Sequence, residues 1–148
     1  MIKTDSTSAL RILVIIIMTC ILSACGRTTV KNSVPASKPY ACDWESQIPA
    51  DGSVVEAGSE FDITWNLLNA GTSEWTTDFG LRYFGGINLT KPGKSRYNLP
   101  APVAPDTVGK CSLDAVAPWE PGEYTMIVVL SDENDNNFCK MDITVKVE

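Results

Sequence analysis

The architecture of this chain is set by Gly58-Ser-Glu-Phe-Asp-Ile-Thr-Trp-Asn-Leu-Leu-Asn-Ala-Gly-Thr-Ser-Glu-Trp75. From Phe61 to Leu67, large apolar side chains occupy every second position and polar side chains occupy the positions between them. A period of two is typical of a β-strand with one buried face. The asparagine, glycine and threonine of residues 69–72 are the residue types of a turn, and Trp75 restarts the apolar pattern. The stretch therefore predicts a central strand with Trp65 in the core, followed by a corner.

Alternation of the same kind recurs up to residue 148, with glycine and proline between the segments. We expect strands at 42–47, with a short continuation at 53–56, and at 60–69, 79–84, 96–99, 110–116, 124–130 and 138–147. The strand at 79–84 is expected to turn Phe79, Leu81 and Tyr83 to one face, and Gly85-Gly86 is expected to end it. About seven short strands with no helix between them predict an all-β fold, an antiparallel two-sheet sandwich of the Ig or fibronectin III type.

The first 24 residues have the pattern of an export signal. Lys3 and Arg11 precede a short apolar run at 12–22, too short to span a bilayer as a mature helix. The run ends in Leu22-Ser-Ala-Cys25, which resembles the lipobox of bacterial lipoproteins. In that chemistry the cysteine thiol receives a diacylglycerol group and a peptidase cuts before it. An ordinary signal peptide, or an uncleaved helix with an incidental cysteine, is the alternative.

On this interpretation the mature chain begins at Cys25, after cleavage between Ala24 and Cys25. Residues 25–40 then comprise the lipidated cysteine and a flexible linker rich in serine, threonine and proline. Residues 41–148 form one domain. The expected location is the extracytoplasmic face of the cell membrane, or the outer membrane in a Gram-negative cell, because Gly26 rather than aspartate follows the cysteine.

Composition argues against several classes of function. The formal net charge of −6 at pH 7 disfavours nucleic-acid binding, whose proteins are normally basic. The chain has no histidine, and it carries neither a Gly-x-Ser-x-Gly nucleophile motif nor a phosphate loop. We therefore expect no enzyme, no cofactor and no metal. The acidic segment 131–137 is expected to be a hairpin loop, with a calcium site as the lesser alternative because the EF-hand spacing is absent.

The central stretch also resembles a known family. The pattern Gly-x-x-Phe-x-x-x-Trp-x-x-x-Asn-x-Gly-Thr-x-x-Trp is supplied by Gly58, Phe61, Trp65, Asn69, Gly71, Thr72 and Trp75. Further downstream, Pro121-Gly122-x-Tyr124 follows in the family's order. Together these motifs resemble the four-tryptophan domain, the Ig-like central domain of the next-to-breast-cancer-one autophagy receptors, which is also found in bacterial surface proteins. The resemblance covers roughly residues 41–148.

This resemblance implies an Ig-like sandwich that recognises other proteins, with the motif residues in structural roles. Tyr124 resembles the tyrosine corner of such sandwiches, whose hydroxyl bonds back to the backbone. The sequence departs from the family at two of its four tryptophan positions: Val128 stands at the third, and the fourth falls near Met141.

Three cysteines, Cys42, Cys111 and Cys139, lie in the domain near the starts of their expected strands. In an Ig-like topology these strands run the same way, so the three thiols gather at one end. The first and last strands face each other, whereas the strand of Cys111 is separated from the first by a central strand. That separation of about two strand spacings of 4.8 Å exceeds disulfide reach. The sequence therefore favours a Cys42–Cys139 disulfide and a free, buried Cys111, while three buried thiols stay open as the alternative.

The leading hypothesis is a membrane-anchored surface lipoprotein whose Ig-like domain binds a protein partner. A carbohydrate- or cell-wall-binding module is the alternative, suggested by exposed aromatic side chains. The expected contact surface is the corner at 72–75 together with the loop at 131–137, both at the end where the first strand starts. Trp75 would supply the apolar contact. Glu74, Asp132, Glu133 and Asp135 would make this end acidic and select a basic partner.

Overall fold

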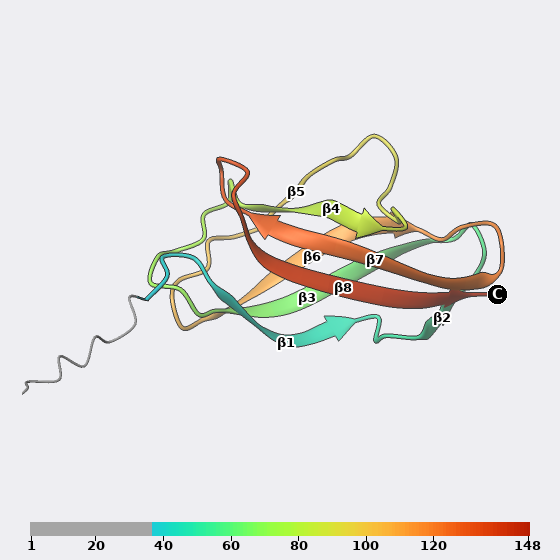
Figure 1. Ribbon diagram of the computed structural model, residues 1–148, viewed down its shortest axis with the longest axis horizontal. Coiled ribbons are helices and arrows are strands. Elements are labelled where there is room, and N and C mark those ends of the chain that lie inside the picture. The colour runs from blue at the N-terminus through green and yellow to red at the C-terminus, as the bar shows by residue number, and fades with distance from the viewer. Residues whose placement is uncertain (1–36) are drawn as a thin grey trace, which may run out of the picture. The chain divides into compact units, whose positions relative to one another are not determined.

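The computed structural model describes residues 37–148 (Figure 1). The export signal, the lipobox with Cys25 and most of the linker lie outside the described residues, so the lipid anchor stays a prediction. Within residues 37–148 there is no helix long and apolar enough to cross a membrane.

Eight strands build two sheets that pack face to face. In chain order the strands are β1 (Cys42–Ile48), β2 (Ser53–Val55), β3 (Glu60–Asn69), β4 (Gly80–Gly86), β5 (Tyr97–Asn98), β6 (Val108–Val116), β7 (Gly122–Ser131) and β8 (Asn137–Val147). One sheet has the order β1-β3-β6 and the other the order β2-β8-β7-β4-β5. Figure 1 shows the five-stranded sheet nearer the viewer, with β3 and β6 behind it. The predicted all-β sandwich is confirmed, with one addition: β2 pairs with β8 in parallel.

β3 lies at the centre of the three-stranded sheet, and its alternation buries one face completely. Ile63, Trp65 and Leu67 have no exposed surface. Burial of a large apolar side chain stabilises the fold by about 1.5–3 kcal/mol. The indole N–H of Trp65 is also satisfied, because it donates to Oε1 of Gln47 in β1 at 3.1 Å. The predicted central strand and its core tryptophan are confirmed.

β7 and β8 are the long central pair of the other sheet. Met126, Val128 and Leu130 of β7 are fully buried, and they alternate with side chains on the outer face. At the start of β7, the hydroxyl of Tyr124 donates to the carbonyl oxygen of Glu120 at 2.9 Å. This is the tyrosine corner that the sequence predicted.

β4 follows the predicted pattern up to Tyr83 and is bulged after it. Phe79 and Leu81 are buried as expected, but Tyr83 is exposed over 39% of its surface. The pairing of β4 with β7 shifts register between Tyr83 and Gly85, and the strand runs on to Gly86. A bulge of this kind interrupts the alternation of side chains. The shift comes after Tyr83, which still pairs with the inward-facing Val128, so Tyr83 shares the face of Leu81 as predicted, although it is partly exposed. The strand ends at Gly86, within the predicted Gly85-Gly86 stop.

The favoured cysteine pairing is present in the structure. Cys42 and Cys139 form a disulfide between β1 and β8, with a Cα–Cα distance of 5.7 Å. Cys111 is free and fully buried. Burial raises the pKa of the Cys111 thiol to about 12, so this thiol is un-ionised and unreactive at neutral pH.

Candidate functional site

The predicted contact residue Trp75 belongs to the core. It has no exposed surface, and its backbone forms a two-way bridge with Val103, at 3.0 and 2.9 Å. Its ring centroid lies 5.6 Å from that of Phe138, which in turn contacts Tyr40 and Phe79. The apolar contact with a partner expected of Trp75 was wrong, because this aromatic cluster closes over its ring. A buried ring cannot contact a partner.

The corner that carries Trp75 is organised by Asn69 and Gly71. The amide of Asn69 donates to the carbonyl oxygens of Ser73 and Val103 at 3.0 and 2.9 Å, and its oxygen accepts from the N–H of Gly71. A side chain at Gly71 would overlap the backbone of Pro39. The Asn-x-Gly part of the motif is thus explained by packing against the segment that enters the domain.

In the acidic loop between β7 and β8, the first carboxylate, that of Asp132, is hydrogen-bonded within the loop itself. Asp132 is only 4% exposed and accepts hydrogen bonds from the backbone N–H groups of Asn134 and Asn136 and from the Asn136 amide, at 2.8–2.9 Å. Burial acts to raise the pKa of Asp132, but these hydrogen bonds, together with the charge of Arg96, lower it below its ordinary value. Asp132 is therefore committed to shaping its own loop, and the contact with a partner predicted for it was wrong.

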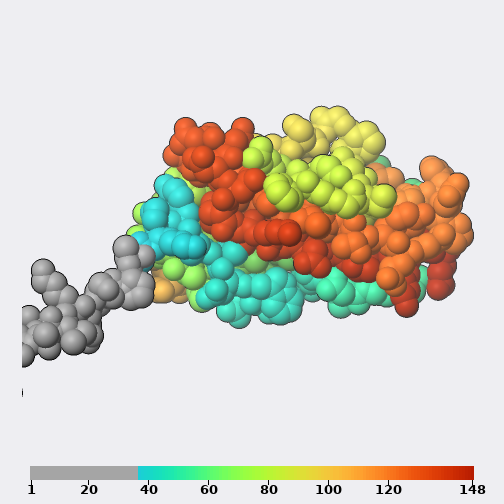
Figure 2. Space-filling model, in the orientation of Figure 1, coloured from blue at the N-terminus to red at the C-terminus, as the bar shows by residue number. Residues whose placement is uncertain are grey.

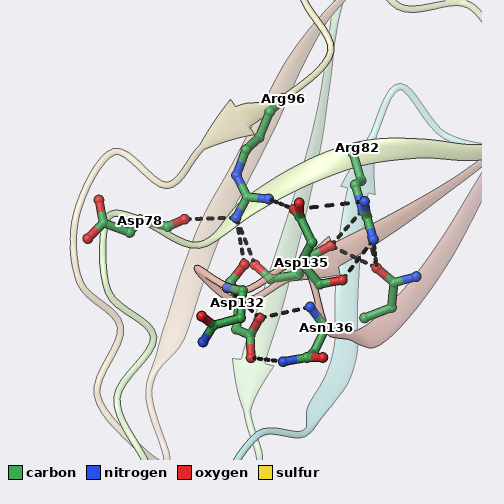
Figure 3. A network of polar contacts seen from close by, with 9 residues as sticks. Asp78, Arg82, Arg96, Asp132, Asp135 and Asn136 are labelled. Carbon is green, nitrogen blue, oxygen red and sulfur yellow. Dashed lines mark hydrogen bonds and ion pairs between the residues drawn. The ribbon is translucent and has the colours of Figure 1, made fainter.

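Arg96, in the segment before β5, ties this loop to the sheet (Figure 3). Its Nη2 donates to the carbonyl oxygens of Asp78 and Asp132, each at 2.8 Å, and its Nη1 donates to Oδ1 of Asp135 at 2.6 Å. One guanidinium thereby joins three segments that are distant in the sequence.

Arg82 of β4 reaches the same loop from the other side, as Figure 3 shows. It donates to the carbonyl oxygen of Asp135 at 2.8 Å and to Oδ1 of Asn137 at 2.7 Å. Asp135 also forms ion pairs with both arginines. The sequence did not predict these two arginines. Arg82 lies on β4 and Arg96 directly before the edge strand β5, and no local sequence pattern marks either of them.

The end of the sandwich is consequently less acidic toward solvent than expected. The packing of Trp75 on Phe138 does place the corner and the loop at the same end, as predicted. Of the four acidic residues proposed for contact, however, Asp132 is buried and Asp135 is neutralised. Only Glu74 and Glu133 are exposed without an ion pair in the described part of the chain.

A different surface carries exposed apolar side chains. Next to the loop, the outer face of the five-stranded sheet has a shallow groove of about 290 Å³. It is lined by Phe84, Val129, Asn137, Phe138, Cys139 and Lys140. Phe84 is 56% exposed, although Val129 beneath it is almost fully covered. Figure 2 shows this face, with β4, β7 and β8 toward the viewer. The sequence signal was present: Phe84 is out of phase with the buried Phe79 and Leu81.

Two tryptophan side chains are also exposed, on other elements. Trp44 lies on β1 and is 59% exposed, and Trp119 lies between β6 and β7 and is 80% exposed. The ring of Trp119 covers Gly58, where φ is +70° and where any side chain would overlap the indole. Because Trp44, Phe84 and Trp119 come from separate elements, they do not form one row along a sheet.

The structure brings carboxylates of neighbouring strands together on the three-stranded sheet. Asp62 of β3 lies directly opposite Asp114 of β6, and both line a hollow of about 370 Å³ with Glu60. Lysines from the loop before β5 offset this charge: Lys91 contacts Glu60 at 2.7 Å and Lys94 contacts Asp114 at 3.3 Å. Among residues 37–148, no group of three or more potential ligands is arranged to hold a metal ion.

The family model described as the Ig-like domain from next to BRCA1 gene matches residues 48–148. The chain belongs to this family. The match begins in the last residue of β1 and includes the motif residues from Gly58 to Tyr124.

Individual relatives share about 30% sequence identity with this chain, over about half of its length. The next to BRCA1 gene 1 protein of Mus musculus is 32% identical over 76 residues, and that of Rattus norvegicus is 29% identical over 77 residues. Each alignment covers 51% of this chain and only 8% of the relative. Among solved structures, the CARDB domain of PF1109 from Pyrococcus furiosus aligns with a TM-score of 0.45 and 13% identity, covering 74% of this chain and 94% of that one.

Proposed function

We propose that this chain is a lipid-anchored protein-binding module of the cell envelope, whose contact surface is the groove around Phe84. Membership of a family of Ig-like domains and the sandwich fold support an interaction module. The observation that carries the proposal is Phe84 itself, a large apolar ring 56% exposed on a sheet face. Such an anchor gains binding energy when a partner covers it.

The groove is held rigid by its surroundings. Asn137 at its border accepts hydrogen bonds from Arg82 and from the hydroxyl of Ser131, at 2.7 and 2.8 Å. The disulfide at Cys139 fixes the strand beneath. A preformed surface loses little conformational entropy on binding, so a modest apolar contact suffices for specific association.

A protein suits this surface better than a polysaccharide. Sugar rings stack on aromatic side chains, but the three most exposed ones, Trp44, Phe84 and Trp119, lie on separate elements, and Tyr83 beside Phe84 is only 39% exposed. A groove with one exposed phenylalanine and Lys140 at its rim fits an apolar side chain flanked by polar groups. Glu74 and Glu133 nearby favour a partner that is basic around this contact, with association that weakens as salt rises.

The binding test places a photo-crosslinking phenylalanine analogue at position 84 of the full-length protein in native envelopes. Position 119 is the matched control, because Trp119 is also an exposed aromatic. We expect a protein adduct of defined mass at 84 and none at 119. Phe84→Ala should then weaken binding of that protein by roughly thirtyfold, the effect of an interface hot spot. Adducts only at 119, or saturable polysaccharide binding that Phe84→Ala abolishes, would contradict the proposal.

The anchor has its own test. Two acyl chains give stable membrane attachment, with about 0.8 kcal/mol for each buried methylene. Cys25→Ser should therefore abolish lipid labelling and release the protein from the membrane fraction, whereas Cys20→Ser should not. If the Cys25→Ser protein still matures to the same size and stays with membranes, the anchor is not at Cys25.

A further inference from the structure

The first half of β8 has an open edge. β7 pairs with β8 along its whole length, but on the other side β2 pairs only with residues 145–147. The chain before β2 extends this cover by one residue: Gly52 donates to the carbonyl oxygen of Thr144 at 2.8 Å, and the N–H of Thr144 donates to Asp51 at 2.9 Å. Residues 140–143 therefore have a neighbouring strand on one side only.

Thr144 shows which backbone groups face this edge. Its N–H and C=O point away from β7, toward β2. Backbone groups of a strand alternate between its two sides with a period of two residues. Those of Asp142 and Lys140 therefore point the same way and face the open edge. Two N–H and two C=O groups are thus presented in the pattern that accepts an added strand.

The side chains of these two residues carry opposite charges. Lys140 and Asp142 are both exposed on the outer face of the sheet. Neither forms an ion pair with any residue in the range 37–148. Met141 lies midway between them. A single lysine on an edge discourages pairing with other strands. When the same strand from a second copy lies alongside in the antiparallel direction, however, a lysine and an aspartate two residues apart are each placed opposite the other's charge.

We propose that β8 pairs with β8 of a second copy of this chain, antiparallel and about a two-fold axis through Met141. In this register Lys140 lies opposite the partner subunit's Asp142, and Asp142 lies opposite the partner subunit's Lys140. Two ion pairs and four backbone hydrogen bonds form, and the two five-stranded sheets become continuous. A shift of two residues in either direction would bring like charges together, so only this register is favoured.

The space beside the edge is bounded at one end by the Cys42–Cys139 disulfide and at the other by the bonds of Asp51 and Gly52 to Thr144, so an added strand can pair only along residues 140–143. A gap of about 310 Å³ separates this part of β8 from β1 and is lined by Trp44, Gln47, Asp51, Lys140, Met141 and Asp142. Trp44 is 59% exposed there. A second copy would cover part of its ring, which adds apolar burial to the hydrogen bonds.

The inference does not depend on the groove of Phe84. Asp142 does not line that groove, whereas Lys140 lies at its rim. A variant at position 142 therefore tests self-association alone, and loss of the dimer with partner binding intact would leave the proposed function standing.

The experiment uses the full-length chain in detergent, with two different affinity tags, co-purification and sedimentation velocity. We expect the unmodified chain to dimerise. K140D and D142K should each weaken the dimer at least about tenfold, because both opposing pairs become like-charged. Mixing the K140D chain with the D142K chain should restore association, since opposite charges face each other again. K146D, on the part of β8 that β2 covers, is the matched control and should dimerise normally.

Circular dichroism and thermal unfolding establish that each variant is folded. The proposal is overturned if the unmodified chain is monomeric at the highest soluble concentration, if folded K140D and D142K chains dimerise as well as the unmodified one, or if their mixture stays monomeric.

Discussion

The end of the sandwich that holds the Cys42–Cys139 disulfide and the outer face of the five-stranded sheet use their side chains in different ways. At the disulfide end, the aromatic side chains pack on one another and the aspartates are bound by backbone N–H groups or by arginines. On the sheet face, Phe84 is exposed, and Lys140 and Asp142 have no ion pair within the described range. The aspartates of the loop at 131–137 are thus used in contacts within the domain. The side chains on the outer face of the sheet are instead available to a partner.

Among the contacts of these two regions, the disulfide should contribute most to the free energy of unfolding. It closes a span of 97 residues, for which chain-entropy estimates give about 4–5 kcal/mol. We expect the Cys42→Ala/Cys139→Ala variant to lose about this much free energy of unfolding in urea titrations. Reductant should lower the unfolding midpoint of the unmodified protein and leave that of the variant unchanged. An unmodified protein that is indifferent to reductant would show that the end is held by packing alone.

Arg96 tests whether the loop at this end is truly fixed by the arginines. Arg96→Ala removes the donor shared by the carbonyl oxygens of Asp78 and Asp132 and the ion pair with Asp135. We expect a loss of about 1.5–3 kcal/mol by chemical denaturation, and faster amide hydrogen exchange in residues 132–136. Lys94→Ala is the matched control. Its ion pair with Asp114 is exposed and should contribute less than about 1 kcal/mol. Equal effects of the two substitutions would refute the distinction.

Cys111 lies in the interior of the sandwich, and its burial makes the stability of the fold depend on pH. Its thiol pKa is raised from 9.0 to about 12 in the folded protein by burial. Between these pH values the unfolded chain loses the proton and the folded chain keeps it, so stability falls as pH rises, by up to about 1.4 kcal/mol per unit. Below pH 9 the thiol has no effect on the slope. Urea titrations from pH 8 to 11 should give a flatter dependence for Cys111→Ala than for the unmodified protein. Parallel curves would mean that this thiol is hydrated.

Phe84 should give the smallest effect on stability. Because its ring is 56% exposed, Phe84→Ala should change the free energy of unfolding by less than about 1 kcal/mol. Thermal unfolding monitored by circular dichroism measures the change. A loss of several kcal/mol would place Phe84 among the structural residues and remove the contrast with the disulfide end.

The sequence predicted the elements whose alternation is uninterrupted. β3 was predicted with its observed bounds, and the buried positions of β6, β7 and β8 follow the same period. The prediction failed where contacts between distant segments decide the outcome. Trp75 is buried by Phe138 and Val103, and neither lies near it in the sequence. Asp135 is neutralised by arginines from before β5 and from β4, and no local pattern contains that information.

The candidate site shows the same limit. The acidic loop was recognisable as a loop, but whether its carboxylates face solvent or backbone depends on a turn in which Asp135 has a φ of +63°. Phe84, by contrast, could be recognised from its phase along β4. The open edge of β8 is not visible in the sequence, because it arises from the shortness of β2, which covers only three of the eleven residues of β8.

The position of the disulfide also determines how the domain carries mechanical load. Cys42 is the first residue of β1, and Cys139 lies near the start of the last strand. A pull between Ser37 and Glu148 is transmitted from Cys42 directly to Cys139, so the residues between the two cysteines carry no tension. Two segments can be detached: residues 37–41, which accept hydrogen bonds from residues 70–73, and the segment from Cys139 to Glu148, which is bonded to β7 and β2. Under tension applied between the two ends of the described domain, the covalent bond therefore confines stretching to the two terminal segments and leaves the fold between Cys42 and Cys139 unloaded.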